Sequence, residues 1–359
     1  MKIISIVGAR PQFIKAAPVS IALAKNGFQE YLVHTGQHYD YGMSEVFFKE
    51  LGIAEPSINL GVGSGTHAQQ TGRMLIELEA VLESQKPDLV LVYGDTNSTL
   101  AGAIASVKLH IKLAHVEAGL RSYNREMPEE HNRVLTDHCA DLLFCPTQSA
   151  IDNLTHEGIR NSVFLVGDTM YDAILLFSRI AAHNSKILQT LKLVKREYLL
   201  TTIHRAYNTD HIDRLKSIFI AFQRVNDVIV FPIHPRTRLA ITASRLSIPD
   251  NVKIIEPIGY LDMLMLEQNA RIILTDSGGM QKEAYFFHVP CLTLRLETEW
   301  IETVTSGWNK LVDCDQTKII QGINMSDWPS SSPTPFFGDG NASQKIVNIL
   351  STYDNSNLP

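Results

Sequence analysis

The chain has 359 residues, of which 45% are hydrophobic and 19% charged, and its formal net charge is −6. This composition is typical of a globular enzyme and argues against a disordered or fibrous chain and against a basic nucleic-acid surface. The length exceeds the size at which one hydrophobic core usually stops growing, so two domains with a ligand cleft between them are expected.

Targeting and crosslinking signals are weak. No run approaches the roughly 18 uninterrupted apolar residues of a membrane span, and the N-terminus is predicted to be a β-strand rather than a signal peptide. The four cysteines are scattered without a C-x-x-C pair, which predicts neither a zinc site nor a disulfide framework. A cytoplasmic protein without nucleic-acid or membrane partners is expected.

Short runs rich in Ile, Val and Leu alternate with amphipathic stretches of helical length. This alternation predicts βα units and parallel sheets. Apolar residues at spacings of three and four predict a helix over 67–85. The strands expected in the first half cover residues 2–8, 31–35, 88–93, 111–116, 141–145 and 163–166.

A charged stretch at 184–197 interrupts this pattern, and a new series starts with a strand at 198–203. Further strands are expected near 228–233, 252–255, 271–275, 290–294 and 310–313, and a last helix near 341–352. The predicted fold is α/β, with two Rossmann-like doubly wound domains. Their expected bounds are 1–183, a linker at 184–197, 198–340, and a C-terminal segment at 341–359 that can pack back on the first domain.

Residues 8–15 leave the first strand through a glycine and enter a helix. Ligands of open α/β sheets bind beyond the carboxyl ends of strands, so polar residues there are candidates. Arg10 and Lys15 can face one opening, and two cations beside a helix N-terminus suit a phosphate or a departing anion. The alternative is an ordinary strand-helix turn with surface cations.

Three carboxylates follow the same pattern. Glu117 comes directly after a predicted strand, Asp95 follows another one after a single glycine, and Glu129 lies twelve residues beyond Glu117 at a predicted helix start. Structural alternatives exist, because Asp95 can cap a helix beginning near Ser98 and Glu129 suits the positive end of its own helix. Their convergence on one edge of a doubly wound sheet favours a single acid/base site.

In the second half, a Ser-Gly-Gly turn at 277–279 leads from a strand into a helix. Such a turn offers backbone N–H groups to a diphosphate, and Glu283, one turn later, is placed for ribose hydroxyls. A lone histidine is more often structural than functional. His204 and His234, however, both lie beside arginines at strand ends, which favours anion binding.

Taken in order, these segments resemble the non-hydrolysing UDP-N-acetylglucosamine 2-epimerase family, which has the two-domain glycosyltransferase-B fold. The resemblance covers nearly the whole chain and is carried by residues 8–15, 94–96, 115–121, 128–133, 145–147, 166–168, 204–205, 276–283 and 295–302. It implies that UDP leaves by anti elimination to give a 2-acetamidoglucal and then adds back with carbon 2 inverted. It also implies a homodimer.

The resemblance assigns roles residue by residue. Asp95, Glu117 and Glu129 take the acid/base and intermediate-stabilising roles, and His204 joins them beside the diphosphate. The implied UDP-binding residues are Arg10, Lys15, His234, Ser277, Gly278, Gly279, Glu283 and Arg295. No metal-ligand cluster or G-x-G-x-x-G motif is evident, so neither a metal nor a nicotinamide cofactor is expected.

The sequence also departs from the family pattern. Residues 37–44 differ from the usual segment, which leaves open the allosteric UDP-N-acetylglucosamine site of many bacterial members. Tyr207 and Trp300 stand where the family commonly has Glu and Arg. Together with the shortened loop at 124–128, this resembles the branch acting on UDP-2,3-diacetamido-2,3-dideoxy-glucuronate in O-antigen and capsule pathways. Such an acidic sugar needs an extra cation, for which the candidates are Arg125, Arg236 and Arg238.

Three other functions remain open at this point. The nearest alternative is 2-epimerisation of UDP-N-acetylglucosamine to UDP-N-acetylmannosamine. A glycosyltransferase of the same fold would have a similar nucleotide site but leaves the three carboxylates unexplained. A non-enzymatic nucleotide-sugar sensor would not need the three carboxylates together.

Overall fold

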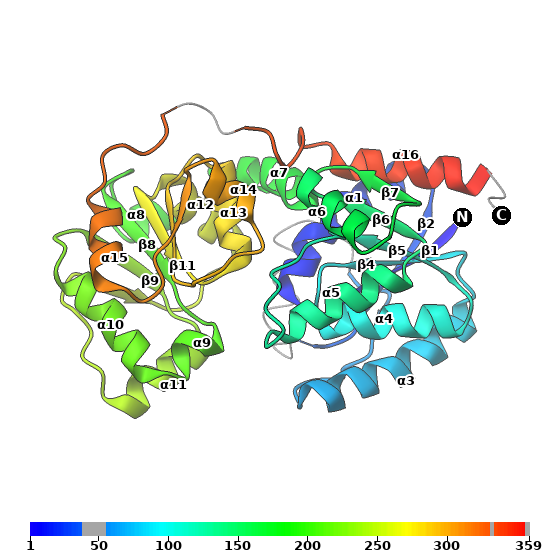
Figure 1. The fold of residues 1–359 in the computed structure, drawn as a ribbon, viewed down its shortest axis with the longest axis horizontal. Helices are drawn as coiled ribbons and strands as arrows, with labels where there is room; N and C mark the ends of the chain where they lie inside the picture. Colours follow the sequence, from blue (N-terminus) through cyan, green and yellow to red (C-terminus); the bar gives the residue numbers. More distant parts are fainter. Residues whose placement is uncertain (38–54, 331–333, 356–359) are drawn as a thin grey trace. The chain divides into compact units, whose positions relative to one another are not determined.

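The computed structural model describes residues 1–37, 55–330 and 334–355, apart from the side chains of Arg10, Asp354 and Asn355. The chain divides into two compact units, and Figure 1 colours it from blue at the N-terminus to red at the C-terminus. Unit 1 comprises Met1–Leu176 and Pro335–Pro359, and unit 2 comprises Phe177–Thr334. Residues 38–44, where the sequence departs from the family pattern, lie outside the described part.

Unit 1 contains a parallel sheet with the strand order β3-β2-β1-β4-β5-β6-β7. Helices follow the strands, so the central strands are buried on both faces and consist of continuous apolar runs. The strands are β1 (Lys2–Val7), β2 (Gln29–His34), β3 (Ile58–Asn59), β4 (Leu89–Tyr93), β5 (Lys112–Val116), β6 (Leu142–Cys145) and β7 (Val163–Leu165).

The helices of unit 1 pack apolar stripes on this sheet. Met74, Leu78 and Leu82, spaced four residues apart, form such a stripe on α3 and belong to the buried core cluster that includes Ile6 and Val92. The helices are α1 (Arg10–Lys25), α3 (His67–Gln85), α4 (Asn97–Lys108), α5 (Pro128–Cys139), α6 (Gln148–His156), the first part of α7 (Thr169–Asn184), and α16 (Ala342–Asn355).

Unit 2 contains a second parallel sheet, with the order β10-β9-β8-β11-β12-β13. Its strands are β8 (Tyr198–Thr202), β9 (Val228–Pro232), β10 (Val252–Ile255), β11 (Ile272–Thr275), β12 (Cys291–Thr293) and β13 (Asn309–Leu311). Its helices are α8 (Ile187–Thr190), α9 (Ala206–Thr209), α10 (Ile212–Gln223), α11 (Pro235–Ser244), α12 (Tyr260–Asn269), α13 (Gly278–Phe286), α14 (Ile301–Thr305) and α15 (Gln316–Ile323), together with the end of α7.

The unit boundaries differ from the predicted ones for a physical reason. The charged stretch at 184–197 carries Ile187, Leu188, Leu191 and Leu193, which pack against the core of unit 2. The division therefore falls inside α7, at Leu176, rather than in that stretch. At the other end, α16 belongs to unit 1, where it lies against α1 (Figure 1).

Each sheet reverses its strand order once, and this reversal positions the site. In unit 1 the chain builds β2 and β3 on one side of β1 and then β4 to β7 on the other. In unit 2 the reversal falls at β8 and β11. Ligands of doubly wound sheets bind at such switch points, beyond the carboxyl ends of the strands.

Candidate active site

Gln12 holds the backbone of the turn that follows β1, and it is not among the residues predicted for the site. The buried side chain of Gln12 accepts hydrogen bonds from the N–H groups of Gly8 and Ala9, at 2.8 and 3.0 Å. Its amide donates to the carbonyl oxygen of Tyr93 at 2.7 Å. These two backbone N–H groups are therefore occupied within the chain, and glycine at position 8 serves close packing against Thr35 and Ser98.

Glu117 and Lys15 form an ion pair at the switch point of unit 1. Both side chains are nearly buried, with exposed fractions of 6% and 12%. A methyl group on Gly94 would lie 3.2 Å from Glu117 Oε2 and 3.4 Å from Lys15 Nζ, so a glycine at the end of β4 leaves room for the pair. Lys15 therefore lies against a carboxylate in this structure.

The backbone of Glu117 is strained, with a φ of 74°. Residues with a side chain rarely adopt this left-handed conformation, and it persists only where the surroundings enforce it. The N–H groups of Glu117 and Ala118 both donate to the carbonyl oxygen of Phe144, at 3.0 and 3.1 Å. The turn after β5 is thereby held against β6.

Asp95 does not cap the helix that follows it. The N-cap of α4 is Thr96, whose hydroxyl accepts the N–H of Thr99. The Asp95 carboxylate instead pairs with Arg133 at 2.6 Å. The backbone carbonyl oxygen of Asp95 accepts a hydrogen bond from the side-chain amide of Asn132 at 2.9 Å. The side chain of Asp95 is 35% exposed, so its carboxylate keeps access to solvent while Arg133 is buried.

The N-terminus of α5 brings a second carboxylate into this network. Glu129 is its second residue and is partly buried, whereas Glu130 is buried and pairs with Arg133. Glu130 also accepts from the N–H groups of Ser122 and Tyr123, at 2.9 and 2.8 Å. Burial raises the pKa of Glu130, but these hydrogen bonds and the charge of Arg133 outweigh it and lower the pKa.

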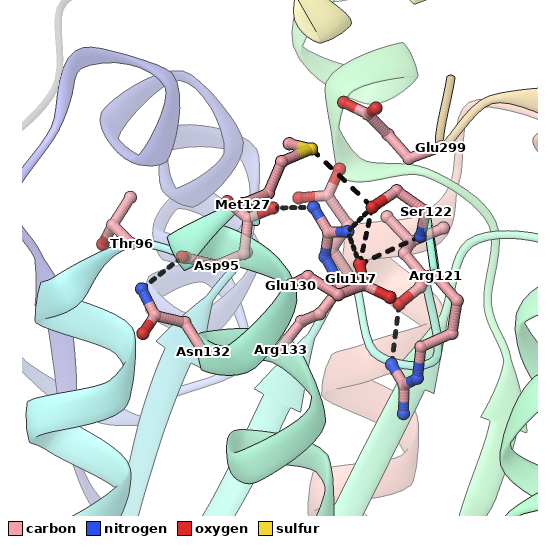
Figure 2. A network of polar contacts seen from close by, with 12 residues as sticks. Asp95, Thr96, Glu117, Arg121, Ser122, Met127, Glu130, Asn132, Arg133 and Glu299 are labelled. Atoms are coloured by element: carbon pink, nitrogen blue, oxygen red, sulfur yellow. Dashed lines mark hydrogen bonds and ion pairs between the residues drawn. The ribbon is translucent and has the colours of Figure 1, made fainter. Parts of the chain in front are cut away.

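Arg133 joins the parts of this site. Figure 2 shows its guanidinium between Asp95 and Glu130, with Glu117 on the adjacent strand exit. The register of β4 and β5 pairs Tyr93 with Val116, so the residues that follow these strands are neighbours. The structure therefore brings the turns that carry Asp95 and Glu117 together. Glu129 is the neighbour of Glu130, which Arg133 binds.

In unit 2, the buried carboxylate of Asp276 organises the switch point. It accepts from the backbone N–H groups of His204 and Arg205, at 3.1 and 3.0 Å, and from the side chain of Asn208 at 3.0 Å. Asp276 is fully buried and directly follows β11. It therefore fixes the loop after β8, and His204 Nδ1 lies 3.4 Å from its Oδ1.

His204 and His234 face each other, with ring centroids 5.7 Å apart. His234 is the N-cap of α11, and its Nδ1 accepts the N–H of Arg236 at 3.2 Å, which leaves the proton on Nε2. Burial lowers the pKa of both histidines, and the charge of Arg236 lowers both further. Near neutral pH, both rings are therefore uncharged hydrogen-bond donors.

The N-terminus of α13 is built from the Ser-Gly-Gly turn. The hydroxyl of Ser277 caps the helix, and Gly278 and Gly279 form its first two positions. A side chain on Gly278 would overlap the carboxylate of Glu299, whereas Gly279 faces more open space. Glu299 in turn pairs with the buried Arg295 at 3.0 Å.

Glu283 lies in the middle of α13 and is buried. Its carboxylate accepts from the hydroxyl of Tyr260 at 3.2 Å. The helix therefore presents one carboxylate just beyond the turn that carries the two glycines.

Comparison with known proteins identifies the family. A family model described as UDP-N-acetylglucosamine 2-epimerase matches residues 21–351. The chain is 55% identical to a UDP-N-acetylglucosamine 2-epimerase homolog from Methanococcus maripaludis, over 98% of this chain and 99% of that one. The chain belongs to the UDP-N-acetylglucosamine 2-epimerase family.

Two further relatives carry more specific names. A UDP-2,3-diacetamido-2,3-dideoxy-D-glucuronate 2-epimerase from Pseudomonas aeruginosa is 48% identical over 98% of this chain and 99% of its own length. The crystal structure of Methanocaldococcus jannaschii UDP-GlcNAc 2-epimerase with UDP-GlcNAc and UDP superposes with a TM-score of 0.91 at 47% identity. It covers 98% of this chain and all of that one.

The family membership confirms the predicted reaction class and fold class. The chain is an isomerase, a non-hydrolysing 2-epimerase of UDP-N-acetylamino sugars, with the two-domain glycosyltransferase-B-like architecture. In the described part of the chain, no helix is long and apolar enough to cross a membrane. Among the same residues, no cluster of three or more His, Cys, Asp or Glu side chains is arranged to hold a metal ion.

The structure places the candidate sugar-binding cations of this epimerase differently from one another. Arg236 pairs with Asp210 and Arg238 with Glu256, each at 2.7 Å on the exposed surface. Arg125 lies in the exposed loop before α5, four residues before the predicted catalytic Glu129. Arg10 begins α1, and its side chain lies outside the described part.

The two aromatic departures from the family pattern also differ. Tyr207 is half-exposed, and the guanidinium of Arg214 lies 3.8 Å from the centre of its ring. Trp300 is buried, and the ammonium of Lys282, which is itself buried, lies 3.8 Å from the centre of its ring. The epimerase therefore has a buried cation–π pair next to Glu299.

Several residues of the site are absent from the sequence-based candidates, although the quoted motifs contain most of them. They are Gln12, His115, Arg121, Glu130, Arg133, Asp137, Asn208 and Asp276. Only the Glu130–Arg133 pair has a local signal, because residues three apart share one face of a helix. The others depend on contacts between distant segments.

Proposed function

We propose that this epimerase inverts carbon 2 of UDP-2,3-diacetamido-2,3-dideoxy-glucuronate to give the manno epimer, for surface-polysaccharide synthesis. The observation that carries the proposal is Trp300, buried on Lys282 where most of the family is expected to have an arginine. The similarity to the Pseudomonas aeruginosa enzyme supports the same substrate. The homodimer and the cytoplasmic location are proposed from the family resemblance.

Unit 1 supplies the acid/base groups in this proposal. A carboxylate removes the proton from carbon 2, the electron pair forms the C1–C2 double bond, and the C1–O bond breaks as UDP leaves. UDP then adds back through its β-phosphate oxygen, and a proton returns to carbon 2 on the other face. Asp95, Glu117 and Glu129 share these steps, with Lys15 orienting Glu117 and Arg133 orienting Asp95.

Unit 2 holds the nucleotide in this proposal. The N-terminus of α13, with Gly278 and Gly279 in its first turn, suits the oxygens of a diphosphate. His204 and His234 donate hydrogen bonds from uncharged rings, and Arg295 adds a positive charge that Glu299 balances in the free protein. Glu283 takes the ribose hydroxyls.

The carboxylate of the sugar requires a cation, and we assign this role to Arg125. Arg236 and Arg238 are already held by surface carboxylates, and breaking those pairs opposes their use. Arg125 lies in the loop that leads into α5, and the proposed catalytic Glu129 follows in the first turn of that helix.

The substrate is tested by turnover of the purified enzyme with each nucleotide sugar, followed by NMR of the anomeric proton. We expect the acidic sugar to be epimerised with the higher kcat/KM. Arg125→Ala should raise KM for the acidic sugar and leave KM for UDP-N-acetylglucosamine unchanged. An equal or higher kcat/KM for UDP-N-acetylglucosamine contradicts the proposal.

That outcome would favour the second candidate function, conversion of UDP-N-acetylglucosamine to UDP-N-acetylmannosamine. The observation in its favour is the high structural similarity to the Methanocaldococcus jannaschii enzyme, whose structure holds UDP-GlcNAc and UDP. The acid/base and nucleotide-binding assignments are the same for both candidates.

A further inference from the structure

Asp137, on α5, lies at the centre of a buried polar network that the proposed reaction steps do not use. Its Oδ1 lies 2.7 Å from His115 Nδ1. Its Oδ2 accepts from the N–H of Gly119 at 3.1 Å and from the guanidinium of Arg121 at 2.7 Å. The side chains of Asp137 and His115 are fully buried. His115 lies in β5, one residue before its end, and Gly119 and Arg121 lie in the turn that follows this strand.

The first link runs from this network to Asp95. His115 Nε2 lies 2.8 Å from the carbonyl oxygen of Gly94, and because a carbonyl oxygen only accepts, Nε2 donates. The N–H of Gly94 donates to the carbonyl oxygen of Val116 at 3.0 Å. Gly94 is thereby held on both sides by consecutive residues of β5, and Asp95 is the next residue along the chain.

The second link runs to Glu117. His115 and Gly119, two residues before and two residues after it, both bind the Asp137 carboxylate. Glu117 has a left-handed backbone that an isolated chain would leave. Anchoring the turn on both sides of the strained residue opposes its relaxation.

Asp137 is itself fixed in place. Arg121 reaches beyond it and makes two parallel hydrogen bonds to Glu157, the C-cap residue of α6, at 2.6 and 2.7 Å. Gly119 packs so closely on Ala150 that a side chain there would overlap its carbonyl oxygen. Burial raises the pKa of Asp137, but His115 and Arg121 outweigh it and lower the pKa, so the carboxylate stays ionised.

We infer that Asp137 is a positioning residue for the epimerase reaction, which acts through His115 and Gly119 to hold the strand exits that carry Asp95 and Glu117. It does not touch the substrate. The inference rests on the proposed catalytic roles of Asp95 and Glu117, and it adds a residue from outside the strand-exit candidates.

The test compares Asp137→Asn with Asp141→Asn. Asp141 is a matched control because it holds the opposite end of the same strand, through Leu113 N–H and Lys112, each at 2.9 Å. We expect Asp137→Asn to lower kcat by about a hundredfold and to leave KM and the Kd of UDP within about threefold, since misplacement acts on chemistry rather than binding. Asp141→Asn should keep the kcat of the unchanged enzyme.

Arg121→Lys serves as a second variant if Asp137→Asn does not fold, because it keeps the charge but loses the paired hydrogen bonds. It should lower kcat by about tenfold at unchanged UDP affinity, as expected for loosened positioning. An unchanged kcat in the folded variants overturns the inference, and so does a loss confined to UDP affinity. Glu117→Gln, assayed in parallel, separates the two proposals: if it retains full activity, the catalytic assignment fails first.

Discussion

The two units each gather their strand exits around one buried aspartate, but they do so with different partners. In unit 1, Asp137 reaches in from helix α5 and binds the side chains of Arg121 and His115. In unit 2, Asp276 lies directly after strand β11 and binds backbone N–H groups of the loop that follows the neighbouring strand β8. The first arrangement holds carboxylates among charged side chains, and the second holds a loop that carries His204 and Arg205 through backbone N–H groups.

This difference matches two chemical tasks. Acid/base groups must keep defined positions while charges form and disappear, and the ion pairs with Lys15 and Arg133 hold the proposed acid/base residues Glu117 and Asp95. Binding a diphosphate requires N–H donors, and the anions near them in unit 2 have partners of their own: Asp276 accepts backbone N–H groups and Glu299 pairs with Arg295. Unit 1 is therefore suited to chemistry and unit 2 to nucleotide binding.

The largest expected effect comes from replacing Glu117, one of the three proposed acid/base residues of unit 1. Glu117→Gln should lower kcat by about 10² to 10⁴-fold, the usual contribution of a positioned acid or base, with the Kd of UDP unchanged. Steady-state kinetics and calorimetry measure the two quantities. Glu126→Gln, at an exposed position in the same region, is the matched control. Full activity of Glu117→Gln would contradict the proposed acid/base role of Glu117.

The next largest effect should come from Asp276→Asn in unit 2. Its amide group would face donors that now bind a carboxylate, so the loop carrying His204 should shift. We expect the Kd of UDP to rise about tenfold, which corresponds to the loss of roughly one charge-assisted hydrogen bond. Calorimetry with Asp250→Asn, an exposed position, as control measures this. If Asp276→Asn kept its UDP affinity but had a lower kcat, unit 2 would contribute to chemistry, and the proposed division between the two units would be contradicted.

A smaller effect should report the strain at Glu117. Glu117→Gly and Glu117→Ala both lose the ion pair with Lys15, but only glycine accepts a φ of 74° without cost. The glycine variant should be more stable than the alanine variant by about 1 kcal/mol in urea unfolding. At Glu79, inside helix α3, the order should reverse by about the same amount. The same order at both positions would argue against strain.

The smallest effect concerns pH. Burial lowers the pKa of His204 and His234 in the folded state, so the unfolded chain binds more protons and stability rises with pH. The contribution is complete above the unfolded value of about 6.5 and is lost as pH falls below it. All three tryptophans lie in unit 2, so their fluorescence follows that unit. The urea concentration at the midpoint of unfolding should be lower at pH 5.5 than at pH 7.5.

The control for this experiment is the double variant His204→Gln and His234→Gln, whose midpoint should depend less on pH. In the described part of unit 1, the groups with lowered pKa values among the acids are Asp137, Glu130 and Asp339, whose stabilising contribution is lost only at lower pH. A midpoint that rises on acidification would show that the histidines gain protons on folding.

The fold is predictable from the sequence because buried parallel strands are continuous apolar runs. The strand expected at 252–255 has those bounds, and most of the others differ by one or two residues. β3 is missed because Ile58–Asn59 is too short to form a run. The stretch at 184–197, predicted as a linker from its charges, contains leucines that pack on the core of unit 2, and this contact is not visible in the local sequence.

The candidate site is predictable only in part. Position after a strand identifies Asp95 and Glu117, but local sequence permits either Asp95 or Thr96 to cap α4, and Arg133, 38 residues away, takes the Asp95 carboxylate. Asp137 lies late in a helix, where nothing in its neighbourhood indicates that it turns inward to His115. Such roles depend on tertiary contacts that no periodicity or spacing records.

The division of labour between the units is tested most directly by deuterium incorporation at carbon 2, measured by NMR in D₂O at saturating UDP-sugar. Glu117→Gln should lose incorporation although it binds UDP normally. Asp276→Asn should incorporate deuterium at close to the rate of the unchanged enzyme once the substrate is saturating. Loss of incorporation in Asp276→Asn at saturation, with incorporation retained in Glu117→Gln, would contradict the account.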